Sequence, residues 1–170
     1  METADWSDKR IDRTIKKLIE LFKNSNEFFE DGMESNFSRT FVDIITPAPP
    51  KLYELLSPYL WYGYNRQDTR INGISITVVA EALTWINYIE NDNTLLKKKK
   101  ILEEALYARH HYIRDAAMTG IDILSNPASL TAIVRAYSFE KIEPYRQILS
   151  KSIINIKKIR EEIEKKNPIY

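Results

Sequence analysis

Residues 112–137, YIRDAAMTGIDILSNPASLTAIVRAY, decide the fold because they read as two helices joined by a turn. In the first half, apolar and small residues recur at helical spacing, with Ala116, Ala117 and Gly120 on one stripe. This spacing predicts a helix over 113–124 with one buried face. Asn126 and Pro127 are residue types that open a helix, and a second apolar stripe follows them. The small residues predict that two helices approach closely at Gly120.

The same pattern returns on both sides of this stretch. Placed over PYRQILSKSIINI at 144–156, YIRDAAMTGIDIL aligns Arg114 with Arg146 and Ile121 with Ile153. Shifted back along the chain, its buried stripe falls on apolar or small positions within 78–86. Both shifts lie within the periods of about 20–50 residues that are typical of repeat proteins, in which each unit buries its stripe against the next. We therefore expect three helix pairs, and we assign HEAT-like helix pairs to 74–166.

The rest of the chain also predicts helices. Ser7 is a suitable N-cap, Pro49 or Pro50 suits the first turn of a helix, and Pro58 is expected to kink that helix. A chain of 170 residues with only four glycines favours helices joined by short loops over a β-sandwich. We expect one all-α domain over 1–170, with N-terminal helices and an aromatic loop in 1–73. The predicted helices cover 7–23, 37–45, 49–60, 74–90, 94–108, 113–124, 127–137 and 144–166.

The stretch at 112–137 resembles the short HEAT-like repeats of bacterial proteins. Those repeats open their second helix with an apolar residue, an arginine and two small residues, as 113–117 does, and they turn at Asn or Asp followed by Pro, as 125–127 does. In the third pair, Ile148 and Leu149 replace the small residues. The resemblance covers about 74–160. It implies a right-handed, α-solenoid-like array of antiparallel helix pairs, with the N-terminal helix as a cap.

Composition excludes several kinds of chemistry. Lysine and arginine total 25 against 24 aspartates and glutamates, so the net charge of +1 gives no global field that attracts nucleic acid. The chain has no cysteine and two histidines, and it contains no nucleophile-elbow, phosphate-loop, dinucleotide or zinc motif. We therefore assign no catalytic, cofactor-binding or metal-binding residue. The absence of a signal peptide and of a long apolar run predicts a cytoplasmic protein that does not cross a membrane.

Three polar groups have both a plain and a functional interpretation. The adjacent His110 and His111 form a solvated turn unless they bind a metal ion or move protons. The lysine run at 97–100 is expected to be a solvated helix surface, because four successive residues spread around the helix. The acidic loop at 24–38 is a connector unless it presents its adjacent phenylalanines to a basic partner. Its carboxylates and aromatic residues are Glu27, Phe28, Phe29, Glu30, Asp31 and Glu34.

Two surfaces are candidates for binding a partner. The first is an aromatic edge, which either closes the core or binds a partner, because aromatic residues mixed with arginine are common at interfaces. It comprises Trp61, Tyr62, Tyr64 and Arg66. The second is an inner row on the helix faces opposite the buried stripes. The inner row comprises Glu81, Asp115, Met118, Asp122, Lys151 and Ile154. Its acidic residues predict a basic partner surface and repel phosphate, and exposed Met118 and Ile154 amid charges would mark an interface.

These features favour a non-catalytic scaffold or adaptor that binds another protein. An antitoxin, an immunity protein or a subunit of a bacterial defence complex is expected by analogy with small bacterial proteins of this kind. Two alternatives follow from the HEAT-like resemblance: a nucleic-acid-binding protein similar to DNA glycosylases, and a chromophore lyase. The acidic inner row argues against nucleic acid. A homodimer is a further alternative, because the long last helix could cover Ile154 by pairing with a second copy or by folding back.

Overall fold

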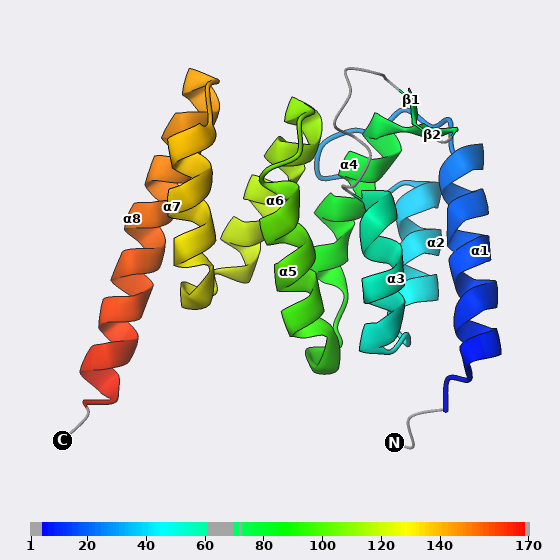
Figure 1. Ribbon diagram of the computed structural model, residues 1–170, viewed down its shortest axis with the longest axis horizontal. Coiled ribbons are helices and arrows are strands. Elements are labelled where there is room, and N and C mark those ends of the chain that lie inside the picture. The colour runs from blue at the N-terminus through cyan, green and yellow to red at the C-terminus, as the bar shows by residue number, and fades with distance from the viewer. Residues whose placement is uncertain (1–4, 61–69, 72, 169–170) are drawn as a thin grey trace.

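The computed structural model describes residues 5–60, 70–71 and 73–168, and this part of the chain is built of helices (Figure 1). The prediction of an all-α fold is confirmed. The α-helices are α1 (Asp8–Asn24), α2 (Asn36–Ile45), α3 (Pro50–Leu60), α4 (Ile76–Trp85), α5 (Leu95–Ala105), α6 (His111–Leu124), α7 (Leu130–Phe139) and α8 (Glu143–Lys166). Three short 3₁₀ turns, η1 (Ile86–Tyr88), η2 (Asp92–Thr94) and η3 (Pro127–Ser129), connect some of them.

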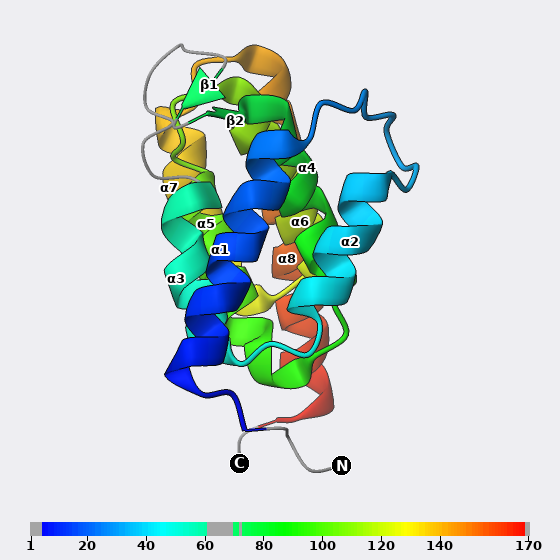
Figure 2. The same ribbon diagram turned by 90° about the vertical axis from the view of Figure 1, so that its right-hand side faces the viewer.

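The helices stand side by side in chain order, from α1 at one end of the molecule to α8 at the other (Figure 1). Along the chain, α1 contacts α2, α3 contacts α4, α5 contacts α6, and α7 contacts α8. Each even-numbered helix from α2 to α6 also contacts the next even-numbered one, and α1, α3 and α5 form a similar row. Seen from the α1 end, the odd-numbered and even-numbered helices form two layers (Figure 2).

Several predicted helix ends are confirmed by their caps. The Ser7 hydroxyl accepts a hydrogen bond from the Arg10 amide at 3.2 Å, and the Asn126 side chain accepts one from the Ala128 amide at 3.0 Å. These bonds satisfy amides that have no partner within the helix. Helix α6 begins at His111, slightly before the predicted start, because Nδ1 of His110 accepts a hydrogen bond from the Tyr112 amide at 3.3 Å.

Helix α6 packs against three other helices, α4, α5 and α8. The close approach predicted at Gly120 is confirmed. A Cβ atom added there would lie 2.6 Å from Cδ2 of the buried Leu102 and 2.6 Å from Nδ2 of Asn87. These distances are shorter than a van der Waals contact, so the position fits no side chain unless a neighbour moves. Gly120 therefore sets how tightly α6 lies against the helices beside it.

Two predicted exposures are wrong. Met118 is only 2% exposed. Helix α6 has neighbouring helices on three sides, so more of its circumference is buried than the single apolar stripe that the sequence indicates. Lys98, in the run expected to be solvated, is 4% exposed and donates a hydrogen bond from Nζ to the Ile89 carbonyl at 2.6 Å. Burial lowers the pKa of this lysine, while the nearby charge of Asp92 partly opposes the shift. Lys98 thus supplies a donor to a carbonyl just beyond η1.

The segment predicted as a polar loop, 61–73, is described only in part. Arg70 pairs with Ser75 and Ile71 with Ile74 in an antiparallel contact of two short strands, β1 (Arg70–Ile71) and β2 (Ile74–Ser75). The sequence did not predict this pairing. Gly73, between the strands, has a φ of 76°, a conformation that suits glycine. Among the described residues, no helix is long and apolar enough to cross a membrane.

Candidate functional site

Two carboxylates of the predicted inner row lie on neighbouring helices, Glu81 on α4 and Asp115 on α6. Partial burial raises the pKa of each, and the charge of Asp31 raises both further. Asp31 belongs to the segment 25–35, which joins α1 to α2 and runs past α4 on its way (Figure 2). Three carboxylates from three separate parts of the chain therefore share one surface. We call Asp31, Glu81 and Asp115 the acidic face.

Glu81 is held in place by its neighbours. Its Oε1 accepts a hydrogen bond from Nε1 of Trp85 at 2.6 Å, which partly offsets the increase in its pKa. The Trp85 ring lies against the exposed ring of Tyr88, with 4.8 Å between their centroids. Glu81 is thus a half-buried carboxylate fixed by an indole N–H, and an exposed tyrosine ring packs on that indole.

The segment 25–35 is fixed by a second carboxylate. Glu27 accepts hydrogen bonds from the Asn36 amide at 3.0 Å and the Phe37 amide at 2.8 Å, which are free amides in the first turn of α2. Its negative charge at a helix N-terminus is favourable, so Glu27 has a role in folding. Phe28 and Met33 of the same segment are strongly exposed. The interpretation of this segment as a mere solvated connector does not explain these two apolar side chains.

Asp115 lies beside a stack of rings at the start of α6. The ring of His111 is 4.8 Å from that of His110 and 4.3 Å from that of Tyr112. The charge of His111 lowers the pKa of Asp115, but the effect is smaller than that of burial. Asp115 in turn contributes to raising the pKa of Tyr145, which burial raises most. The acidic face is therefore bordered by exposed or half-buried aromatic side chains on the α6 side as well.

The other members of the inner row do not join this face as free groups. Met118 is buried, as described above. Asp122 is exposed, but its Oδ1 accepts a hydrogen bond from the Ser152 hydroxyl at 2.5 Å, which links α6 to α8. Lys151 is exposed on α8, and Ile154 is 54% exposed, as predicted. The predicted aromatic edge, Trp61, Tyr62, Tyr64 and Arg66, lies outside the described residues.

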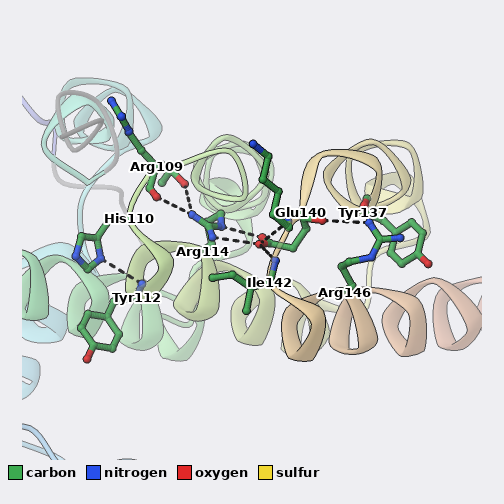
Figure 3. Close-up of polar contacts among 10 residues, drawn as sticks. Arg109, His110, Tyr112, Arg114, Tyr137, Glu140, Ile142 and Arg146 are labelled. Atoms are coloured by element: carbon green, nitrogen blue, oxygen red, sulfur yellow. Dashed lines mark hydrogen bonds and ion pairs between the residues drawn. The ribbon is translucent and has the colours of Figure 1, made fainter. Parts of the chain in front are cut away.

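A buried network joins the α5–α6 pair to the α7–α8 pair (Figure 3). Arg114 donates hydrogen bonds to both carboxylate oxygens of Glu140, from Nε at 2.8 Å and from Nη2 at 3.1 Å. Nη1 of Arg114 also donates to the carbonyls of Ala108 at 3.0 Å and Arg109 at 2.7 Å. Bidentate arginine–carboxylate pairs of this kind form strong, charge-assisted hydrogen bonds with a specific geometry. Arg114 therefore fixes the turn before its own helix and holds the end of α7.

The equivalence of Arg114 and Arg146 in the sequence repeat has a structural counterpart. Nη1 of Arg146 donates to the Glu140 carbonyl at 3.1 Å, just as Nη1 of Arg114 donates to the Ala108 carbonyl. In both cases the acceptor lies six residues before the arginine, so Glu140 and Ala108 occupy equivalent positions relative to the two arginines. Each arginine thus anchors the turn that precedes its helix.

The two histidines lie at the start of α6, and His110 caps the helix. Nδ1 of His110 acts as the acceptor at the start of α6, and burial is the main cause that lowers the pKa of His110, with the charges of His111 and Arg114 adding to it. Within the part of the chain that the structure describes, no group of three or more His, Cys, Asp or Glu side chains is placed to hold a metal ion. The start of α6 thus accounts for His110, while His111 is exposed in the first turn.

Comparison of the chain with protein-family models, with curated proteins and with solved structures found no match. The functional interpretation therefore depends on the burial, contacts and charges of this chain's own residues.

Proposed function

We propose that this protein is a non-catalytic adaptor that binds a basic surface of another protein through its acidic face. The observation that carries this proposal is the placement of Asp31, Glu81 and Asp115, three carboxylates that approach from three separate segments. Asp31 raises the pKa of both other groups. A partner that presents lysine or arginine would relieve this repulsion and would be steered toward the face.

The energetic cost of the acidic face supports a binding role. A carboxylate whose pKa is raised by folding destabilises the folded chain once it is ionised, at pH values above its folded pKa. Natural proteins retain such unfavourable groups mainly where function needs them. The exposed Phe28 and Met33 beside the acidic groups would supply the apolar contacts that a stable interface requires.

We further propose that the helix pairs form a HEAT-like array with its even-numbered helices lining the binding side. Contacts between successive even-numbered helices and the equivalent turn contacts of Arg114 and Arg146 support this arrangement. Arrays of stacked helix pairs form extended surfaces suited to binding other macromolecules. Antitoxin, immunity and defence roles are all special cases of the proposed function. A phosphate backbone would be repelled by the acidic face, which argues against nucleic acid as its ligand.

The test is a comparison of proteins captured from the native host by three forms of the chain. The wild-type protein is compared with Asp31→Lys/Asp115→Lys, which reverses two charges of the face. The control, Glu161→Lys/Glu162→Lys, makes the same change in net charge on an exposed part of α8. We expect a basic partner to be retained by the wild type and by the control and lost by the face variant. Capture of the same partner by all three forms would refute the proposal.

A further inference from the structure

A separate cleft of about 540 Å³ opens between the α5–α6 turn and the end of α7. Its volume falls within the range of about 300–1,000 Å³ that is usual for small-molecule sites. The residues that line it include Tyr107, Arg109, Arg114, Phe139, Glu140 and Lys141. This cleft plays no part in the function proposed above, so the two proposals can fail independently.

The cleft has an excess of free positive charge. Arg114 and Glu140 neutralise each other, and every donor-bearing nitrogen of Arg114 is already engaged. By contrast, the side chains of Arg109 and Lys141 form no ion pair or hydrogen bond with any described residue. Figure 3 shows the guanidinium of Arg109 directed away from the Arg114–Glu140 pair. Neither of these two charges is therefore neutralised by a described residue of the cleft.

A carboxylate close to Tyr107, that of Glu103, does not cancel this charge. Glu103, which contributes to raising the pKa of Tyr107, forms an ion pair with Lys99 at 2.7 Å. Arg135 adds a further cation to the rim, with its guanidinium 5.8 Å from the centroid of the Tyr107 ring. The local charge therefore favours an anion, although the chain as a whole is nearly neutral.

The cleft also offers a free aromatic ring. Phe139 is 66% exposed, and its ring has no ring or cation contact with the described residues. A large apolar side chain that remains exposed at the mouth of a concave, basic cleft is available for stacking. Stacking on an aromatic side chain tolerates any planar base, because every base has a π-face.

We propose that this cleft binds a small ligand that combines a planar ring with a phosphate, as a mononucleotide does. The ring stacks on Phe139, and Lys141 holds the phosphate through charge-assisted hydrogen bonds, joined by Arg109 once its side chain turns toward the cleft. The rigid Arg114–Glu140 pair forms the floor, which keeps the two walls of the cleft at a fixed separation.

The experiment is calorimetric titration of the full chain with adenosine 5′-monophosphate, adenosine and inorganic phosphate. We expect saturable binding of the mononucleotide, and binding of adenosine and of phosphate that is weaker by at least a factor of about ten. Arg109→Ala and Lys141→Ala should each weaken mononucleotide binding at least about fivefold, and more so at low ionic strength. Phe139→Ala should weaken mononucleotide binding at least about fivefold and leave phosphate binding unchanged.

Matched controls are Lys157→Ala for the loss of charge and Leu96→Ala for the loss of an exposed apolar side chain, since both residues are exposed and lie outside the cleft. Circular dichroism verifies that each variant is folded. Three results would overturn the proposal: no saturable heat up to about 5 mM mononucleotide, phosphate binding as tight as that of the mononucleotide, or equal effects of Lys157→Ala and Lys141→Ala.

Discussion

Replacement of Glu140 by alanine should destabilise the chain by about 3 kcal/mol. The side chain of Glu140 is 3% exposed and that of Arg114 15%, so truncation leaves a guanidinium without its counter-ion in a largely dry site. Removal of one partner of a buried pair typically costs about 3–5 kcal/mol. We expect the lower end of that range, because Arg114 keeps its hydrogen bonds to the carbonyls of Ala108 and Arg109.

The measurement is thermal and chemical unfolding of the wild type and the variants. For a chain of this length, a loss of about 3 kcal/mol lowers the Tm by about 6–12 °C. The double variant Arg114→Met/Glu140→Leu replaces both charges by apolar groups, and it should cost at least about 1 kcal/mol less than the sum of Arg114→Met and Glu140→Leu. An exposed pair on α8, Arg160–Glu164, is the control, and its loss should cost about 0.5 kcal/mol or less.

The reasoning would be refuted if Glu140→Ala changed the free energy of unfolding by less than about 1 kcal/mol. It would also be refuted if the two single variants and the double variant were additive, because additive effects mean that the side chains do not depend on each other.

Three further outcomes follow from the structure. Gly120→Leu should cost at least about 1–3 kcal/mol in chemical unfolding by overpacking against Leu102, and an unchanged Tm would contradict the packing of α6. Folding lowers the pKa of His110. The stabilisation that its neutral side chain provides as a cap is therefore present above about pH 6.5 and is lost as the pH falls through the folded pKa. Replacement by asparagine, His110→Asn, keeps a cap that does not titrate, so it should reduce the loss of stability on acidification. Asp115→Asn should raise stability at pH 7 by up to about 0.5 kcal/mol, because it removes a partly exposed, repelled carboxylate, and an unchanged or lower Tm would argue against repulsion within the acidic face.

Local signals in the sequence predicted most of the helices. Ser7, Asn126 and Pro144 stand where the structure begins a helical segment, because capping and the restricted backbone of proline act within a few residues. The small residue at Gly120 correctly indicated a close helix contact, since only a tight approach explains a glycine on a buried helical stripe.

Exposure and the composition of the site were harder to predict. The burial of Met118 and Lys98 depends on how many helices surround α6 and α5. The spacing of apolar residues along one helix does not reveal that number. The acidic face combines Asp31 with groups on α4 and α6, far along the chain, and only the fold brings them together. The acidic composition of 24–38 was visible in the sequence, whereas its position beside α4 and α6 was not.

The turn anchor shared by Arg114 and Arg146 has a consequence for how such a chain changes length during evolution. Each arginine reaches a carbonyl six residues earlier, so the interaction is encoded within one unit and needs no residue from a neighbour. A duplication or deletion of one whole unit would therefore carry its own anchor with it. The bonds from Arg114 to the Glu140 carboxylate and from Ser152 to Asp122 join α6 to the following helix pair, so both would have to be re-established at a new junction.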